Sequence, residues 1–98
     1  MVEEINDNGG QARFFRHDVS SVPDWERISQ QAKSTFGRVD ILVNNAGILV
    51  FSAVQDTSNE DFARVLDVNV KSVFYGTKYI LPAMKAAGGG SIVYISSI

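Results

Sequence analysis

The stretch that most constrains the fold is residues 40–47, Asp-Ile-Leu-Val-Asn-Asn-Ala-Gly, in which an apolar run ends in two amides and a glycine. A short run of Ile, Leu and Val is typical of a strand buried on both faces of a parallel sheet. In open parallel α/β sheets, ligands bind beyond the carboxyl ends of the strands. Asn44, Asn45 and Gly47 therefore occupy positions where a ligand site is expected.

Two other segments have strand character, residues 12–17 and 91–95, and both run into polar residues. Two stretches with helical periodicity, at about 21–36 and 59–87, separate the strands, and apolar side chains recur in them every three or four positions. Residues 1–8 resemble the last turns of a further helix. Strands that alternate with helices of this length predict parallel pairing, so we expect an α/β fold in at most one domain.

The expected bounds of the two helices follow from capping signals. Ser21, with Asp24 three residues later, is an N-cap pattern, and Gly37 is suited to ending the helix that follows. Residues 57–60, Thr-Ser-Asn-Glu, form a capping box that opens the longer helix. Pro82 lies inside that helix and is expected to bend it.

Composition removes several classes of function. The net charge is −2, and no Lys/Arg cluster provides the electrostatic footprint of a nucleic-acid surface. Cysteine is absent, which excludes disulfides and thiolate zinc sites. No apolar run approaches the ~20 residues of a membrane span, and the polar start is unlike a secretory signal. We therefore expect a cytoplasmic protein that binds neither nucleic acid nor membrane.

The polar residues at the strand ends are the candidates for a site. Because the carboxyl ends of parallel strands share one edge, Asp18, Asn45 and Ser97 are expected to converge. Asn69 interrupts an otherwise apolar helix face, where a buried amide without partners costs about 1–3 kcal/mol. One buried Asn is more often a structural clamp than a catalytic group. The expected presence of Asp18, Asn45 and Ser97 at the same sheet edge favours a functional site.

Four motifs in this order resemble the classical short-chain dehydrogenase/reductase family, across essentially the whole chain. They are His-Asp-Val-Ser at 17–20, Asn-Asn-Ala-Gly at 44–47, Asn-Val at 69–70 and Ile-Ser-Ser at 95–97. The closest likeness is to bacterial alcohol and ketone reductases and 3-oxoacyl reductases. The resemblance implies part of a Rossmann-like doubly wound parallel sheet, with three strands and two full helices. The first βαβ portion and the C-terminal part of that fold are absent from these residues.

The resemblance also implies which residues bind the cofactor, NAD or NADP. Asp18 is similar to the carboxylate that accepts a hydrogen bond from the adenine amino group, with the Val19 amide beside the ring. Asn45, Ala46 and Gly47 resemble the turn that lies against the adenosine ribose, and Val70 resembles a residue that borders the cofactor through its backbone. Asp18 has a second interpretation, as an acid favoured by the dipole at a helix start.

Two residues resemble catalytic groups of the family. Asn69 is similar to the asparagine whose helical site holds a water in a proton relay. Ser97 is similar to the serine that hydrogen-bonds the substrate carbonyl or hydroxyl, with Ser96 the less favoured neighbour. A serine at a strand end also has an ordinary role in turns. Asn44 resembles a clamp on the central sheet.

The activity implied is hydride transfer between a nicotinamide and a small-molecule carbonyl compound or secondary alcohol, in a homo-oligomer that is a dimer or tetramer. A tyrosine is the family's general acid/base, and a lysine lowers its pKa. The Tyr-x-x-x-Lys motif and the glycine-rich pyrophosphate turn are both absent from these residues, since Tyr75 and Lys78 lie three apart.

We therefore expect residues 1–98 to be the central segment of a single NAD(P)-binding Rossmann domain, inactive by itself. The alternative is a non-catalytic truncated product, or an association module that uses the helix at 59–87 as an interface. In the family's sheet, two absent strands lie between 12–17 and 39–43. We expect the first strand to lack its neighbour, and the remaining pair of strands to be marginally stable.

Overall fold

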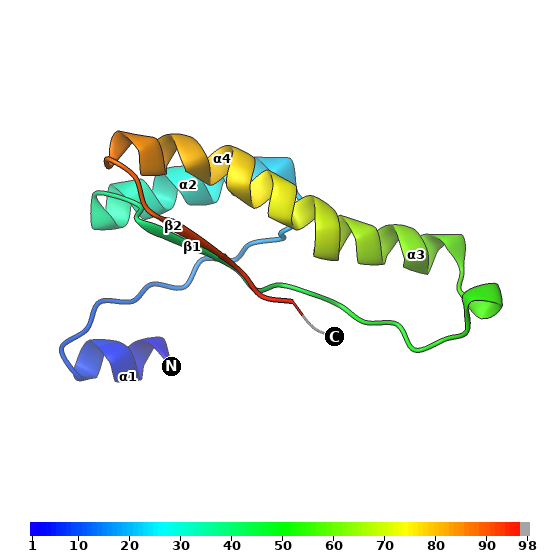
Figure 1. Cartoon of the computed structure of the whole chain (residues 1–98). Helices are drawn as coiled ribbons and strands as arrows, with labels where there is room; N and C mark the ends of the chain where they lie inside the picture. The colour runs from blue at the N-terminus through cyan, green and yellow to red at the C-terminus, as the bar shows by residue number, and fades with distance from the viewer. Residues whose placement is uncertain (97–98) are drawn as a thin grey trace.

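The computed structural model, which describes residues 1–96, contains a small parallel sheet with helices on one side (Figure 1). Figure 1 shows β1 and β2 side by side next to α2 and α4, with α3 continuing the line of α4 beyond the sheet and α1 apart from it. In chain order the elements are α1 (Val2–Asp7), α2 (Val22–Phe36), β1 (Ile41–Asn44), η1 (Val54–Asp56), α3 (Asn59–Leu66), η2 (Asp67–Lys71), α4 (Ser72–Ala86) and β2 (Ser91–Tyr94).

The two strands pair in parallel, as the alternation of strands and helices predicts. Ile41 is opposite Ser91 and Asn44 is opposite Tyr94. The ladder continues past the last pair, because the Ile95 N–H donates to the Asn44 carbonyl at 2.9 Å. This register brings the polar residues after β1 next to those after β2.

The strand predicted at residues 12–17 is not formed. The sheet within the described residues has two strands, and 12–17 runs as chain without a ladder partner (Figure 1). A strand needs a neighbour to satisfy its backbone groups, and none lies beside this segment. Phe14 within it is 81% exposed. The three-strand expectation is thus corrected to two, for the reason that the absent neighbour suggested.

The helix starts largely follow the capping signals. The Ser21 hydroxyl accepts a hydrogen bond from the Asp24 N–H at 3.3 Å, and Gly37 ends α2 with φ 87°. The capping box predicted for 57–60 is displaced by one residue. The Ser58 hydroxyl accepts from the Asp61 N–H at 3.0 Å, while the Thr57 hydroxyl donates back to the Ala53 carbonyl. Both positions offer a hydroxyl with an acid three residues later, so the pattern alone does not separate them.

The long helix predicted at 59–87 is present but not regular. It consists of α3, a wider π turn at Asp67–Lys71, and α4. Pro82 lies inside α4 without ending it, and the bend expected there stays a prediction. Within residues 1–96, no helix is both long and apolar enough to pass through a membrane.

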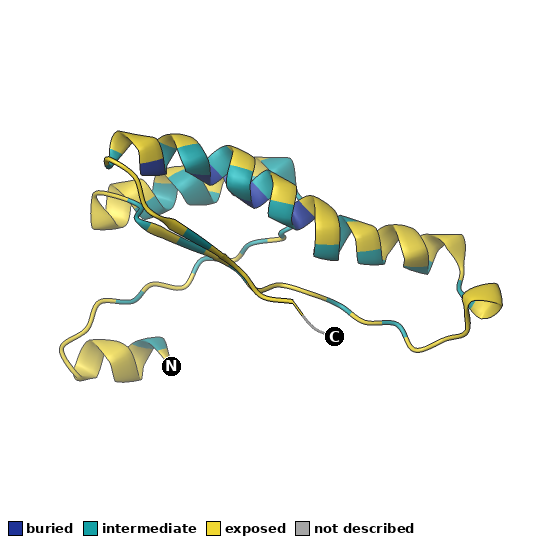
Figure 2. Cartoon of the chain, in the orientation of Figure 1, coloured by how far each residue is buried: buried dark blue, intermediate teal, exposed yellow. Residues whose placement is uncertain are grey.

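The core lies between the two large helices and one face of the sheet. Trp25 from α2 and Ile80 and Met84 from α4 are at most 5% exposed, and Leu42 packs against them. Figure 2 shows the buried positions gathered along α4, with exposed residues over most of the remaining surface. The opposite face of β1 is open, since Ile41 is 65% and Val43 54% exposed. The expectation that this strand is buried on both faces is therefore corrected to one.

Candidate functional site

A cleft of about 470 Å³ lies where the two strands end. Its walls are the loop after β1, the residues after β2 and the π turn of the long helix. Asn45, Ala46, Gly47 and Asn69, four of the predicted site residues, line it together with Ser96. The sheet edge predicted from the sequence therefore carries a real concavity, and the residues that meet there come from three separate parts of the chain.

The Asn69 side chain joins the helix to the loop after β1. Its Nδ2 donates to the Ile48 carbonyl at 2.8 Å, and its Oδ1 accepts from the Ile48 N–H at 2.8 Å. This pair of bonds satisfies both polar atoms of a half-buried amide and fixes the loop that carries Asn45 and Gly47. Asn69 thus has the geometry of a clamp. Its role in a proton relay stays a prediction, and its side-chain atoms already have partners.

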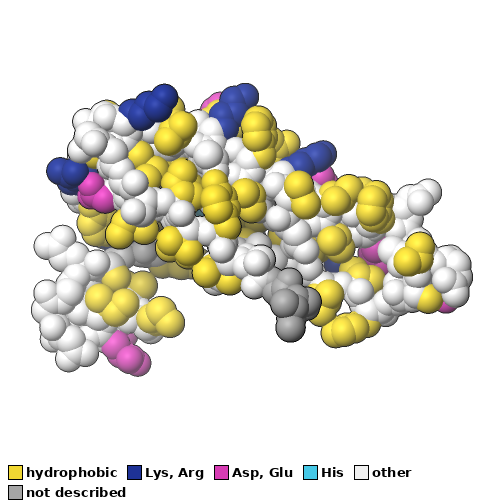
Figure 3. Space-filling model, viewed as in Figure 1, with side chains coloured by type: hydrophobic (Ala, Val, Ile, Leu, Met, Phe, Trp, Pro, Cys, Tyr) yellow, Lys and Arg dark blue, Asp and Glu magenta, His cyan; other side chains and the backbone are white. Residues whose placement is uncertain are grey.

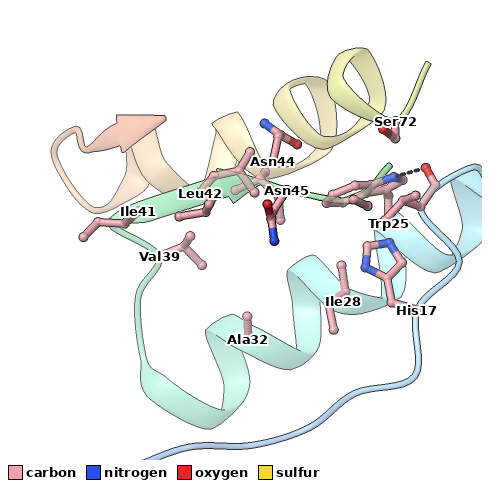
Figure 4. A pocket seen from close by; sticks show the side chains of 14 residues that line it. His17, Trp25, Ile28, Ala32, Val39, Ile41, Leu42, Asn44, Asn45 and Ser72 are labelled. Atoms are coloured by element: carbon pink, nitrogen blue, oxygen red, sulfur yellow. Dashed lines mark hydrogen bonds between the residues drawn. The ribbon is translucent and has the colours of Figure 1, made fainter. Parts of the chain in front are cut away.

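A second cavity, of about 330 Å³, lies on the other side of the β1 end, between this strand and α2 (Figure 4). Asn45 and Ala46 belong to both cavities, and Val19 and His17 form part of the wall opposite β1. The Trp25 indole N–H donates to the Val19 carbonyl at 2.8 Å, which ties this wall to α2. The predicted residues at 19 and 45 therefore face one space.

Two side chains of this second cavity have buried polar atoms without a partner in the described part of the chain. They are His17 Nε2 and Asn44 Nδ2. Burial lowers the pKa of His17, as does the positive charge of Arg27, while Asp24 and Asp18 oppose the shift. The imidazole packs edge-on against Trp25, with ring centroids 4.3 Å apart. The Asn44 side chain points toward α4, where its Oδ1 would lie 2.7 Å from a Cβ at Gly76, while Asn45 points toward the space beside His17 (Figure 4).

Asp18 is exposed and held in a local turn. Its carboxylate accepts hydrogen bonds from the Ser20 N–H at 2.9 Å and from the Ser20 hydroxyl at 2.7 Å. These two bonds lower the pKa of Asp18, so the group is a charged acceptor with lone pairs left for another donor. Its own N–H donates to the Asp24 carboxylate at the start of α2. The Asp18 carboxylate therefore bonds within the turn that precedes α2, and its helix-start and ligand roles both stay predictions.

The remaining predicted residues are placed less directly. Val70 is 58% exposed, and neither Val70 nor Asp18 lines either cavity, so the expected convergence of Asp18 with Asn45 stays a prediction. Ser97 lies outside the described residues. Two residues that sequence reasoning missed are Ile48, whose main chain holds Asn69, and Ser72, a buried serine in the wall of the second cavity. A hydroxyl within an apolar helical stripe was the available signal for Ser72.

Comparison with known proteins identifies the family to which this arrangement belongs. A family model described as short chain dehydrogenase matches residues 1–98. A relative from Thermotoga maritima, described as an uncharacterized oxidoreductase, is 48% identical over 98% of this chain and 38% of its own length. Cyclopentanol dehydrogenase from a Comamonas species is 44% identical over 99% of this chain and 39% of its own length.

A solved structure has the same arrangement of helices and strands. It is 7α-hydroxysteroid dehydrogenase complexed with NADH and 7-oxo glycochenodeoxycholic acid, which superimposes with a TM-score of 0.91 at 40% identity. The superposition covers 98% of this chain and 37% of that one. The chain thus spans less than two fifths of the length of these relatives. Because the family model matches residues 1–98 and the relatives are 44–48% identical to this chain, the chain belongs to the short chain dehydrogenase family.

Proposed function

We propose that these residues are the central segment of a single NAD(P)-binding Rossmann domain. The whole protein would be an oxidoreductase that transfers a hydride between the nicotinamide and a small-molecule carbonyl compound or secondary alcohol. The observation that carries this proposal is the cleft at the ends of β1 and β2, where Asn45, Gly47 and Asn69 meet. A relative of similar fold that binds NADH supports it. By themselves, these residues are expected to turn nothing over.

The donors and acceptors here suit the adenosine half of such a cofactor. Asp18 is a charged acceptor with free lone pairs, as an adenine amino group requires, and Val19 follows it in the chain. Asn45, Ala46 and Gly47 offer amides and open backbone for a ribose, and Val70 is expected to border the cofactor through its backbone. Within residues 1–98, no glycine-rich turn follows a strand. The pyrophosphate of the cofactor would therefore be held by residues outside this segment.

The catalytic half of the proposal concerns proton handling. The bound nicotinamide supplies the hydride. Asn69 is proposed to hold the helix and loop in the arrangement that seats a relay water, with its side chain engaged by Ile48. Ser97 is proposed to donate a hydrogen bond to the substrate oxygen. We also propose a cytoplasmic location for the whole protein.

The test measures nucleotide binding by the protein with its natural flanking sequence. The affinities for NADH and for NADPH are determined by calorimetric titration. Replacing Asp18→Ala removes the charged acceptor, and the affinity should fall between about 10- and 100-fold, the range for a hydrogen bond to a charged group. Ser20→Ala is the matched control. It removes the hydroxyl that donates to the carboxylate but keeps the backbone N–H donor and the charge, so affinity should stay within about threefold.

Either of two results would count against this assignment. Equal nucleotide affinity of the Asp18→Ala variant and the unmodified protein would remove Asp18 from the adenine site. Absence of binding for both nucleotides would remove the proposed function itself.

The alternative, an association module, is favoured by one observation on the long helix. Phe62, Leu66, Val70 and Phe74 recur every four residues and are between 37% and 61% exposed. Figure 3 shows apolar side chains gathered along this part of the surface. We propose that this stripe pairs with a second copy of the chain in a dimer or tetramer. Such pairing would bury apolar area that otherwise faces water.

Sedimentation of the full-length protein checks the association. The double variant Phe62→Glu with Phe74→Glu places charge on the stripe and should convert the oligomer to a monomer at micromolar concentration. Phe51→Glu is the control, because Phe51 is 92% exposed in the loop after β1 and lies outside the stripe. An oligomer that survives the double change would show that another surface forms it.

A further inference from the structure

The π turn at Asp67–Lys71 interrupts the regular helix between α3 and α4, so some contact must stabilise this irregular geometry. A π turn departs from the regular i→i−4 hydrogen-bond ladder, and such turns are frequent at functional sites. This one carries Asn69 and therefore sets where the amide that grips Ile48 is aimed. A return to regular helix would rotate Asn69 away from the loop, since each residue turns the helix by about 100°.

Ser72, the first residue of α4, is the group placed to hold the turn. It is 4% exposed, and it is the buried polar side chain of the core region. Its hydroxyl donates to the main-chain carbonyl of Val68, four residues earlier and within the π turn. This bond spans the irregular segment and provides a donor to a carbonyl there. Hydroxyl groups that bond back to the i−4 carbonyl are known to bend helices.

The contacts of Ser72 connect both cavities. The Ser72 hydroxyl bonds the carbonyl of Val68, the residue directly before Asn69. The Asn69 side chain in turn makes two hydrogen bonds to the main chain of Ile48, in the wall of the larger cleft. Ser72 itself lies in the wall of the smaller cavity, at the end of that cavity near Trp25 (Figure 4). One hydroxyl therefore supports the junction from which the loop at 45–48 is positioned.

We propose that Ser72 is a positioning residue, whose hydroxyl fixes the π turn and so keeps the Asn69–Ile48 pair, and the loop before it, at the cleft. The residue acts on the site only through Asn69. The claim about the loop stands on these contacts, and only its consequence for nucleotide affinity rests on the proposed function.

The decisive measurement is amide hydrogen exchange by NMR on the full-length protein without nucleotide. In Ser72→Ala, the hydrogen-exchange protection of the Ile48 amide should fall about tenfold. The reason is that Asn69 Oδ1, which accepts the Ile48 N–H, would no longer be held in position to accept it. The Trp25 amide, which donates to the Ser21 carbonyl in α2, should keep its protection. The Asn69 side-chain amide resonances should shift as well.

Two further variants separate positioning from general destabilisation. Ser72→Thr keeps a hydroxyl able to bond to the i−4 carbonyl and should restore Ile48 protection to within about threefold of the unmodified protein. Thr77→Ala removes a hydroxyl one turn later, bonded to Tyr94 and not to the π turn, and should leave Ile48 unchanged. Should Ser72→Ala fail to fold, Ser72→Cys keeps a weak donor in a slightly larger side chain and should give an intermediate loss.

The outcomes distinguish this inference from the proposed function. Unchanged Ile48 protection in Ser72→Ala, or an equal loss at Ile48 and Trp25, would overturn the positioning role. A selective loss at Ile48 in a protein that binds neither NADH nor NADPH would uphold the positioning role and reject the nucleotide site.

Discussion

Replacing Gly76 with alanine should destabilise the protein by about 2–3 kcal/mol, although alanine is the better helix former. Gly76 lies in α4 where this helix crosses β1 and α2. A Cβ at this position would lie 2.7 Å from Asn44 Oδ1 and 2.8 Å from Trp25 Cη2. Trp25 cannot withdraw freely, since it is 5% exposed and its indole N–H is bonded to the Val19 carbonyl. The helix would have to move away from the sheet.

Denaturant unfolding of the full-length protein measures this effect as a change in midpoint at constant slope. In an exposed helix the same change would stabilise by up to about 1 kcal/mol, so the sign alone is informative. Gly47→Ala is the matched control for stability. Its Cβ would meet only Asn69 Oδ1, at 3.5 Å, which is an ordinary contact. A Gly76→Ala protein as stable as the unmodified one would mean that α4 and β1 are not packed so closely.

The candidate site was predictable from the sequence to the extent that it depends on strand ends. Asn45 and Gly47 follow a strand whose existence and direction are set by local apolar pattern and by the helix that leads to the next strand. Asn69 stood out because an amide in an apolar helix face must find partners, and the structure supplies them in Ile48. Both inferences use rules that need no knowledge of distant contacts.

Two features were not predictable from the local pattern of residue types: whether a strand has a neighbour, and where the long helix departs from regular geometry. Residues 12–17 have the composition of a strand, but a strand is completed by a neighbour that local pattern cannot supply. The π turn adds part of a residue to one helical turn, and an apolar stripe with spacings of three and four fits either geometry. The proposed role of Ser72 depends on the π turn, so the sequence pattern alone does not predict this role.

The 98-residue chain alone is expected to show no cooperative thermal transition. Its radius of gyration is 15.9 Å, against about 13 Å for a compact domain of 100 residues. Within residues 1–96, the buried apolar side chains are Trp25, Ile80 and Met84, which are 3–5% exposed, and the sheet has two strands. Conformational entropy costs roughly 1–2 kcal/mol per ordered residue, which a core of this size cannot offset.

Calorimetry and the near-ultraviolet circular dichroism of Trp25 provide the measurement. The isolated chain should give a broad, non-cooperative change in ellipticity and self-association that increases with concentration, because the open edge of β1 can pair with other chains. The full-length protein is the control and should melt in a single sharp transition, with Trp25 in a fixed environment. A sharp calorimetric peak from an isolated chain that light scattering finds monomeric would show that α2, α4 and two strands suffice as a folding unit.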